Sequence, residues 1–230
     1  MGCELAAPIT SGAALRANVT NELGWNRTTR LLKNVTGLWL LEECNRLWSI
    51  DAVGTAAGAG IIELVEAAAD IAGGVSVFDP DDPRLSTAAD IPAAIRAICS
   101  ETGQPQPSSP AEVARAILDS IALSFRRTVR AIEDVSGIRA EVIHLGGGGS
   151  LNVLLARLTA SACGRPVHAG PAEATVIGNA LVQAIADGEL TDIAEGRRLV
   201  ERSLPSLIYQ PEPLYDWPAL QARLSEGNRT

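Results

Sequence analysis

Four consecutive glycines, residues 146–149, are the feature that most constrains the fold of this chain. They follow the apolar run AEVIHL, which is typical of a β-strand, and they precede a segment with helical periodicity. A strand that leads into a helix through bare backbone is typical of α/β folds, whose ligands bind at the carboxyl ends of the strands. Glycine lets a flat or charged group lie against the backbone, and the next helix offers free N–H donors. The run is neither Gly-x-Gly-x-x-Gly nor a Walker loop, so a close crossing of strand and helix explains it equally well.

Helical periodicity and capping residues predict most of the remaining chain to be helical. Asp90 and Ser109 are predicted N-caps because each precedes a proline and an apolar repeat, and Gly137 is predicted to close the longest helix. The predicted helices cover residues 28–48, 60–73, 90–103, 109–137, 151–163, 173–186 and 193–203.

Short β runs alternate with these helices, at residues 75–83, 140–145 and 165–170. This alternation predicts an α/β fold, and 230 residues with 47% hydrophobic composition suffice for one large domain or two small ones. The sequence DPDDP at residues 79–83 resembles a carboxylate metal cluster, but its prolines favour a rigid turn with solvated acids. In GPAEATVIGN, we expect Gly178 to permit close helix packing and Glu173 to favour the helix N-terminus.

Charge and hydropathy exclude two classes of partner. The formal net charge is −8 and the isoelectric point is about 4.8, whereas nucleic acids and anionic membranes are bound by clustered Lys and Arg. The N-terminal sequence MGCELAAPIT has no basic segment followed by an apolar one, and acids interrupt the most apolar long stretch, residues 52–74. We therefore expect no nucleic acid, no membrane anchor and a cytoplasmic protein.

The cysteines and histidines do not form a recognisable site. The four cysteines stand singly, without a Cys-x-x-Cys pair or a histidine at metal-ligand spacing, so we expect neither a metal site nor a disulfide framework. A reducing compartment fits this usage. His144 and His168 each lie in an apolar strand, where a lone histidine is more often a core residue than a base.

Several longer segments resemble one family of enzymes. These segments are ANVTNE, RLLKNVTGLWLLEEC, FDPDDPRL, ETGQPQP, GGGSLN, GRPVHAGPAEATVIGNALVQA and YQPEP. Together they resemble the C-terminal domain of FGGY carbohydrate kinases, and within that family the rhamnulokinases. The resemblance implies an actin-like, ribonuclease H-like α/β fold, in which residues 1–230 form the nucleotide-binding domain. It also implies ATP and Mg²⁺ as cofactors and phosphorylation of L-rhamnulose to L-rhamnulose 1-phosphate.

The resemblance assigns the glycine run to adenosine binding. Gly147, Gly148 and Gly149 match the family's triple glycine, which packs against the adenine and ribose of ATP, with Gly148 as the principal contact. Asn152 matches the following Asn, whose amide can bond adenine. The intervening Leu151 departs from the family, which commonly has Gln there.

Two further nucleotide contacts are implied near the start of the chain. Asn34 and Glu42 match polar residues of the segment LKNVTGLWLL, and a separation of eight in the predicted helix would put them on one face, two turns apart. Without the resemblance, Asn34 reads as a surface helix residue. The family commonly has Gln at position 42, and a carboxylate there removes donors and adds negative charge beside ATP.

The resemblance assigns no catalytic residue to this chain. The family's general-base Asp, its sugar-binding residues and a phosphate-contacting loop match positions upstream of Met1, as do the first strands of the domain. We therefore expect the isolated chain to be inactive, to meet L-rhamnulose only with an N-terminal domain, and to self-associate through an uncovered sheet edge. The alternatives are a stand-alone nucleotide-binding module or split-kinase subunit, a remnant without a ligand, and another FGGY kinase acting on xylulose or fuculose.

Overall fold

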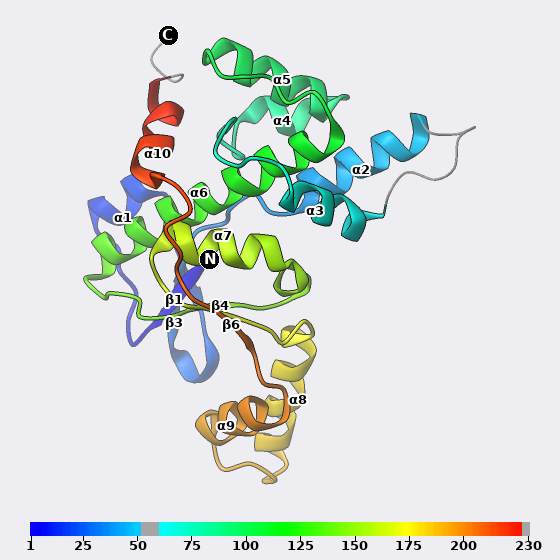
Figure 1. The fold of residues 1–230 in the computed structure, drawn as a ribbon. Helices are drawn as coiled ribbons and strands as arrows, with labels where there is room; N and C mark the ends of the chain where they lie inside the picture. Colours follow the sequence, from blue (N-terminus) through cyan, green and yellow to red (C-terminus); the bar gives the residue numbers. More distant parts are fainter. Residues whose placement is uncertain (52–59, 227–230) are drawn as a thin grey trace. The chain divides into compact units, whose positions relative to one another are not determined.

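The computed structural model describes residues 1–51 and 60–226, and it divides the chain into two compact units (Figure 1). Unit 1 comprises residues 1–140 and the segment that starts at residue 213, and unit 2 comprises residues 141–212. Part of the apolar stretch, residues 52–59, lies outside the described residues. No helix in the described part is both long enough and apolar enough to cross a membrane.

Unit 1 combines a small antiparallel sheet with helices. Its strands have the order β1-β3-β2, so β3 is central and pairs with both neighbours. Leu31 of β3 lies opposite Cys3 of β1, is fully buried, and packs with Leu5 and Ile132 in a hydrophobic cluster. The elements of unit 1 are β1 (Gly2–Leu5), α1 (Gly12–Ala17), β2 (Thr20–Leu23), the 3₁₀ turn η1 (Trp25–Arg27), β3 (Thr29–Leu32), α2 (Trp39–Asp51), α3 (Ile61–Ala69), α4 (Pro83–Thr87), α5 (Ile91–Glu101), α6 (Pro110–Ser136) and α10 (Trp217–Glu226).

The helix α6 is the central element of unit 1. It begins in the predicted capping box, in which the Ser109 side chain bonds the Glu112 N–H and the Glu112 carboxylate bonds the Ser109 N–H. It ends where Gly137 adopts a left-handed conformation with φ 71°, as predicted. Helix α3 packs along it, and α1, α2, α10 and β1 also contact it. The predicted helices at residues 60–73 and 90–103 are confirmed as α3 and α5, and the Asp90 side chain caps α5.

The predicted helix over residues 28–48 is wrong in its first half. Residues 29–32 form β3, residues 33–38 form a loop, and only Trp39–Asp51 is helical. The apolar spacing of this segment suits a helix, but Leu31 is buried between two partner strands. Tertiary pairing therefore overrides the local periodicity.

The predicted β run at residues 75–83 is also wrong. Val77 and Phe78 are buried, but their N–H groups donate to side chains, to Gln104 Oε1 at 3.0 Å and to Ser120 Oγ at 3.0 Å. The Gln104 amide also donates to the Val77 carbonyl at 2.8 Å. Side chains thus satisfy the backbone that a neighbouring strand would satisfy in a sheet.

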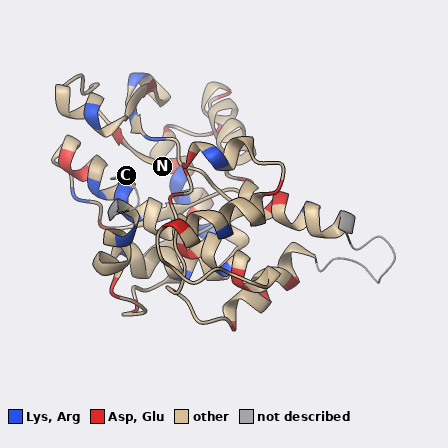
Figure 2. Cartoon of the chain, turned by 90° about the horizontal axis from the view of Figure 1, so that it is seen from above, with Lys and Arg blue, Asp and Glu red and all other residues tan. Residues whose placement is uncertain are grey.

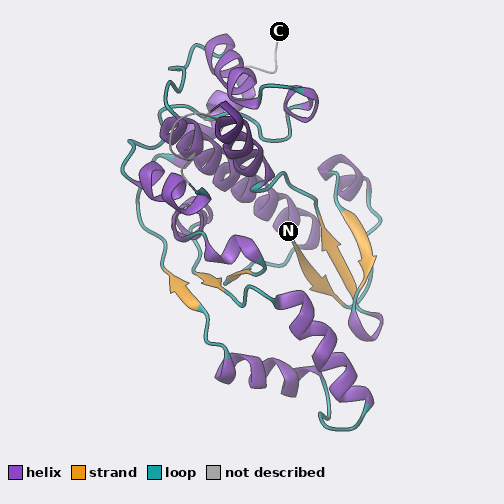
Figure 3. Ribbon diagram, turned by 90° about the vertical axis from the view of Figure 1, so that its right-hand side faces the viewer, coloured by secondary structure: helices purple, strands orange, loops and turns teal. Residues whose placement is uncertain are grey.

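Unit 2 contains a three-stranded sheet of order β4-β5-β6 and three α-helices (Figure 3). Strands β4 and β5 are parallel and are connected through α7, whereas β6 runs antiparallel to β5. The predicted helices at residues 151–163, 173–186 and 193–203 are confirmed as α7, α8 and α9. The elements of unit 2 are β4 (Ile143–Leu145), the 3₁₀ turn η2 (Gly148–Leu151), α7 (Val153–Cys163), β5 (Val167–Ala169), α8 (Ala174–Ala186), α9 (Ile193–Ser203) and β6 (Leu207–Tyr209).

A glycine in α9 permits the close contact between α8 and α9. A Cβ at Gly196 would lie 3.1 Å from the side chain of Leu181, so a larger residue there would press against α8. A Cβ at Gly178 would meet nothing within 4 Å. The prediction that Gly178 permits close packing is therefore wrong, and Gly196 has that role.

Candidate functional site

The glycine turn of unit 2 joins β4 to η2 and α7. Gly147 has φ 73°, a conformation that favours glycine, and its N–H donates to the Pro171 carbonyl at 3.2 Å. The N–H and hydroxyl of buried Ser150 both donate to the Gly147 carbonyl, at 3.0 and 2.7 Å. Bonds on both sides of Gly147 therefore fix the turn.

The centre of this turn is open. A Cβ at Gly148 would meet nothing within 4 Å, so no described part of the protein fills the space beside it. Among the described residues, the N–H groups of Gly148 and Gly149 have no acceptor. Leu151 and Val153 beyond them are 73% and 52% exposed and offer apolar surface. A flat ligand with polar edges can lie against such a backbone.

Asn152 ends this turn and begins α7. Its side-chain oxygen accepts a hydrogen bond from the Leu155 N–H at 2.9 Å, which makes Asn152 the N-cap of the helix. The side-chain NH₂ group remains as a donor, because the cap uses only the oxygen. The resemblance predicts a contact of Asn152 with adenine, and the structure adds this capping role, for which the position of Asn152 just before a helical segment is the sequence signal.

Asn34 and Glu42 both belong to unit 1, but they do not share a helix. Asn34 is exposed in the loop of residues 33–38, and Glu42 is exposed in the first turn of α2. The argument that a spacing of eight residues places them on one helical face is therefore wrong. Neither side chain has a hydrogen-bond partner among the described residues, so both are available to a ligand.

The loop that carries Asn34 is tied to the sequence DPDDP. The Thr36 N–H and hydroxyl both donate to Asp81 Oδ1, at 3.0 and 2.6 Å. In the same turn Asp79 accepts two hydrogen bonds from Arg127 of α6, each 2.8 Å long, and Asp82 caps α4. The prediction of a rigid turn is consistent with this geometry, but the acids are paired rather than merely solvated.

The pairing with Arg127 changes the ionisation of Asp79. Burial disfavours the charged form of this carboxylate, but the hydrogen bonds and the charge of Arg127, with the Asp81 N–H, outweigh burial and lower the pKa of Asp79 below its ordinary value. The same pair raises the pKa of Arg127. Both groups are therefore charged at neutral pH.

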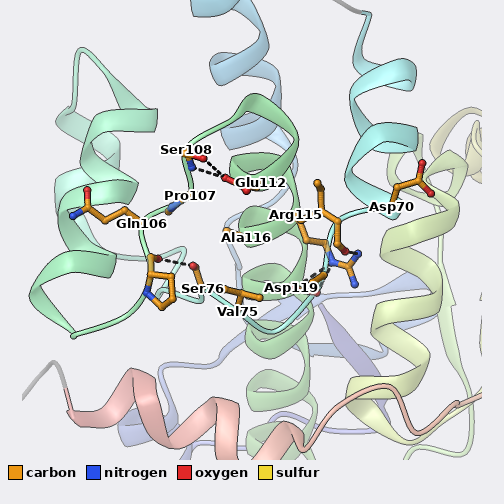
Figure 4. A pocket seen from close by; sticks show the side chains of 13 residues that line it. Asp70, Val75, Ser76, Gln106, Pro107, Ser108, Glu112, Arg115, Ala116 and Asp119 are labelled. Carbon is orange, nitrogen blue, oxygen red and sulfur yellow. Dashed lines mark hydrogen bonds and ion pairs between the residues drawn. The ribbon is translucent and has the colours of Figure 1, made fainter.

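Unit 1 contains a cavity of about 300 Å³ (Figure 4). Figure 4 shows Arg115 and Asp119 of α6 directed toward each other, and Ser108 bonded to Glu112. A second, more polar depression of about 660 Å³ lies beside the DPDDP turn. None of the six predicted nucleotide contacts lines either cavity. The residues around the first cavity are Asp70, Ile71, Ala72, Val75, Ser76, Pro105, Gln106, Pro107, Ser108, Glu112, Arg115, Ala116 and Asp119.

The Arg115–Asp119 pair of the first cavity is already bonded within the protein. The guanidinium of Arg115 bonds Asp119, the carbonyls of Ala68 and Ile71, and the hydroxyl of Tyr215. Burial raises the pKa of Asp119, although the charge of Arg115 acts in the opposite direction. These bonds stabilise the packing of α3 and Tyr215 on α6. Because the guanidinium of Arg115 already bonds acceptors within the protein, it offers little to a ligand.

Along the ribbon in Figure 2, the positions of Lys and Arg are interspersed with those of Asp and Glu. Several arginines have an acidic partner within their own unit, so their charges are locally compensated. These ion pairs are Arg30–Glu22, Arg46–Glu43, Arg84–Asp82, Arg84–Glu101, Arg127–Asp79 and Arg157–Glu212.

In the described part of the chain, no group of three His, Cys, Asp or Glu residues is arranged so that it could hold a metal ion. His144 and His168 are register partners on β4 and β5, with ring centroids 5.4 Å apart in an edge-to-face arrangement. His144 is exposed, so the expectation of a core residue is wrong for it. No disulfide joins the four cysteines, all of which lie in the described part of the chain. Burial raises the pKa of Cys44 to about 12 and that of Cys99 to about 11, which disfavours the reactive thiolate.

Comparison with known sequences gives the relatives of this chain. Residues 1–186 match the C-terminal domain of the FGGY family of carbohydrate kinases. A rhamnulokinase from Bacteroides thetaiotaomicron is 40% identical over 219 residues, which are 95% of this chain and 44% of that enzyme. A rhamnulokinase from Pectobacterium atrosepticum is 38% identical over 226 residues, which are 96% of this chain and 44% of that enzyme. The chain thus spans less than half the length of these relatives, and the predicted resemblance is confirmed.

Comparison with solved structures gives the fold. The structure of xylulose kinase from Rhodospirillum rubrum matches 98% of this chain and 43% of that protein, with a TM-score of 0.64 and 18% sequence identity. This likeness confirms the predicted actin-like α/β fold of a sugar-kinase C-terminal domain.

Proposed function

Since the chain belongs to the FGGY family of carbohydrate kinases, we propose that residues 1–230 form the nucleotide-binding part of an ATP-dependent kinase. We propose L-rhamnulose as the sugar and L-rhamnulose 1-phosphate as the product. The names and the 38–40% identity of the rhamnulokinase relatives support this choice of sugar.

The glycine turn carries the nucleotide part of the proposal. Its open face at Gly148, the Gly148 and Gly149 N–H groups without acceptors in the described part of the chain, and the exposed Leu151 suit a ligand that combines a flat ring with polar edges. Adenosine has these properties. In the proposal the backbone of Gly147, Gly148 and Gly149 packs against adenine and ribose, and the Asn152 amide donates to the base while its oxygen holds α7 in place.

Asn34 and Glu42 make separate proposed contacts, from unit 1. The Asn34 amide can donate to a ligand oxygen or accept from a ligand hydroxyl, whereas the Glu42 carboxylate can only accept hydrogen bonds. A carboxylate close to an anionic ligand weakens binding through charge repulsion. Glu42 is therefore proposed to lower the affinity of this chain for ATP.

Phosphoryl transfer requires more than these contacts. The reaction needs a sugar hydroxyl aligned with the γ-phosphate and a base that accepts its proton. We assign the base role to no acid of this chain, because its acids are either paired in unit 1, like Asp79 and Asp119, or match no catalytic position. We propose Mg²⁺ as the companion of ATP and assign no residue of this chain to the ion.

Two measurements test the proposal. Calorimetric titration of residues 1–230 with ATP and Mg²⁺ should detect weak binding, and a coupled assay with L-rhamnulose should detect no turnover. A positioned base typically accelerates proton transfer ~10²- to 10⁴-fold, and alignment of the two reactants accelerates the reaction by several further powers of ten. A chain that supplies neither should therefore have a turnover rate below detection.

Restoration of kinase activity by an added N-terminal half provides the positive control for the assay. When the upstream half of a rhamnulokinase relative is supplied, fused or as a separate chain, phosphorylation of L-rhamnulose should appear and exceed that of xylulose or fuculose. Absence of ATP binding would contradict the nucleotide assignment, and robust turnover by residues 1–230 alone would place the base within this chain.

A further inference from the structure

We propose that Asp81 is a positioning residue for the loop that carries Asn34. The inference rests on the proposed contact between Asn34 and the nucleotide. Asp81 Oδ1 accepts two hydrogen bonds from Thr36, one from its N–H at 3.0 Å and one from its hydroxyl at 2.6 Å. Bonds to a carboxylate are charge-assisted and are stronger than those between neutral groups.

The loop has few other restraints. At its start the Lys33 N–H donates to the Met1 carbonyl, and at its end the Leu38 carbonyl accepts from the N–H of Glu42. Between these ends, the two bonds from Thr36 to Asp81 are the only hydrogen bonds that residues 34–37 form within the described part of the chain. Asp81 therefore controls the conformation of the segment that presents Asn34.

Asp81 is itself held to the core of unit 1. Its N–H donates to Asp79 Oδ1 at 3.1 Å, and Asp79 forms two 2.8 Å bonds with Arg127 of α6. Arg127 also lies 3.7 Å from the Asp81 carboxylate. Pro80, between the two acids, is buried and fixes φ of the turn. A continuous chain of polar contacts thus connects the long helix to the Asn34 loop.

This connection affects affinity through pre-organisation. A ligand that needs one conformation of a loop binds with an apparent affinity reduced by the fraction of molecules that have it. When Asp81 holds Thr36, the loop occupies one conformation before the nucleotide arrives. Loss of the Asp81 side chain spreads the loop over several conformations, and the dissociation constant for ATP rises.

The experiment compares four variants of residues 1–230, Asp81→Ala, Asp81→Asn, Asp82→Ala and Asn34→Ala, by calorimetric titration with ATP and by thermal unfolding. Asp81→Ala should raise the dissociation constant about three- to tenfold, since it removes two hydrogen bonds. Asp81→Asn keeps an acceptor oxygen and should restore affinity to within about twofold of the wild type. Asp82→Ala is the matched control, because it removes the cap of α4 in the same turn without touching Thr36. It should lower thermal stability and leave ATP affinity unchanged.

The outcomes separate this inference from the function on which it rests. If the wild type binds no ATP, or if Asn34→Ala binds as tightly as the wild type, the proposed role of Asn34 is wrong and the positioning role falls with it. If Asn34→Ala weakens binding but Asp81→Ala does not, only the role of Asp81 is overturned. An equal loss of affinity in Asp81→Ala and Asp82→Ala would indicate general destabilisation and would also overturn it.

Discussion

The side-chain oxygen of Asn152 accepts a hydrogen bond from the backbone N–H of Leu155, at 2.9 Å. One residue therefore both ends the glycine turn and starts α7. The oxygen and the NH₂ group of the Asn152 amide can therefore be tested separately, because the oxygen caps α7 and the NH₂ group can donate to a ligand.

Substitution of Asn152 should separate stability from nucleotide binding. Asn152→Ala removes the cap and should destabilise the protein by about 1 kcal/mol, whereas Asn152→Asp keeps a capping oxygen and should be nearly as stable as the wild type. Both variants lose the amide donor, so both should bind ATP at least about fivefold more weakly. Thermal unfolding and calorimetry measure the two effects. Wild-type affinity in Asn152→Asp would exclude the amide from the nucleotide site.

A charged side chain at Gly148 should abolish ATP binding. Gly148→Asp places a carboxylate on the open face of the turn, where it would occupy the proposed adenine surface and repel an anionic ligand. Gly178→Asp adds the same charge at another glycine of unit 2 with open space and should retain affinity. Circular dichroism should show that both variants fold. Equal ATP affinity in Gly148→Asp and the wild type would remove the proposed site.

Glu42→Gln should tighten ATP binding about two- to fivefold, because it replaces an exposed negative charge with an amide that can donate. The gain should shrink as salt concentration rises, since salt screens the repulsion that the substitution removes. Titrations with ATP at low and high ionic strength measure both effects. The half-buried Glu43 supplies the control, since Glu43→Gln removes an equal charge that is already paired with Arg46. The same gain in both variants would indicate a long-range charge effect.

The Asp79–Arg127 pair should make stability depend on pH. Because the pKa of Asp79 is lower in the folded protein than its ordinary value of 3.8, the pair stabilises the fold fully above that value, and this contribution disappears as pH falls through the lowered pKa. Asp79→Asn should therefore destabilise the protein at pH 7 and have little effect at a pH below the lowered pKa, as measured by denaturant unfolding. Asp134→Asn, at an exposed acid of α6 without an ion pair among the described residues, should show no such dependence. A destabilisation by Asp79→Asn that is equal at both pH values would contradict the role of the charge.

Self-association should proceed through the edge strand β6. Leu207 and Ile208 are 64% and 56% exposed on a strand that pairs on only one side, and such an edge is a template for another chain. Replacement of both residues by Lys should lower the concentration-dependent mass in light scattering. Leu15→Lys, at an 82% exposed apolar residue of α1, removes apolar surface away from a sheet edge and should not lower it. A wild-type chain that stays monomeric at high concentration would contradict the prediction.

The sequence determined the elements whose signals are local. Ser109 with Glu112, Asp90 and Gly137 satisfy backbone groups within a few residues of themselves, so the limits of α5 and α6 could be predicted from capping chemistry and periodicity. Strand, glycines and helix at residues 140–163 were predictable for the same reason. The family could also be identified from sequence, because its motifs are contiguous.

The tertiary structure decided the features that depend on distant partners. Residues 29–32 have helical spacing, yet pairing with β1 and β2 makes them a strand, and Val77 and Phe78 lie outside any sheet because Gln104 and Ser120 satisfy their backbone. Asn34 follows this strand and lies in a loop rather than in the predicted helix, because the helix begins only at Trp39. The bond between Thr36 and Asp81 joins residues 45 apart in sequence. No local pattern contains such a contact, because only packing of the chain brings the donor to its acceptor.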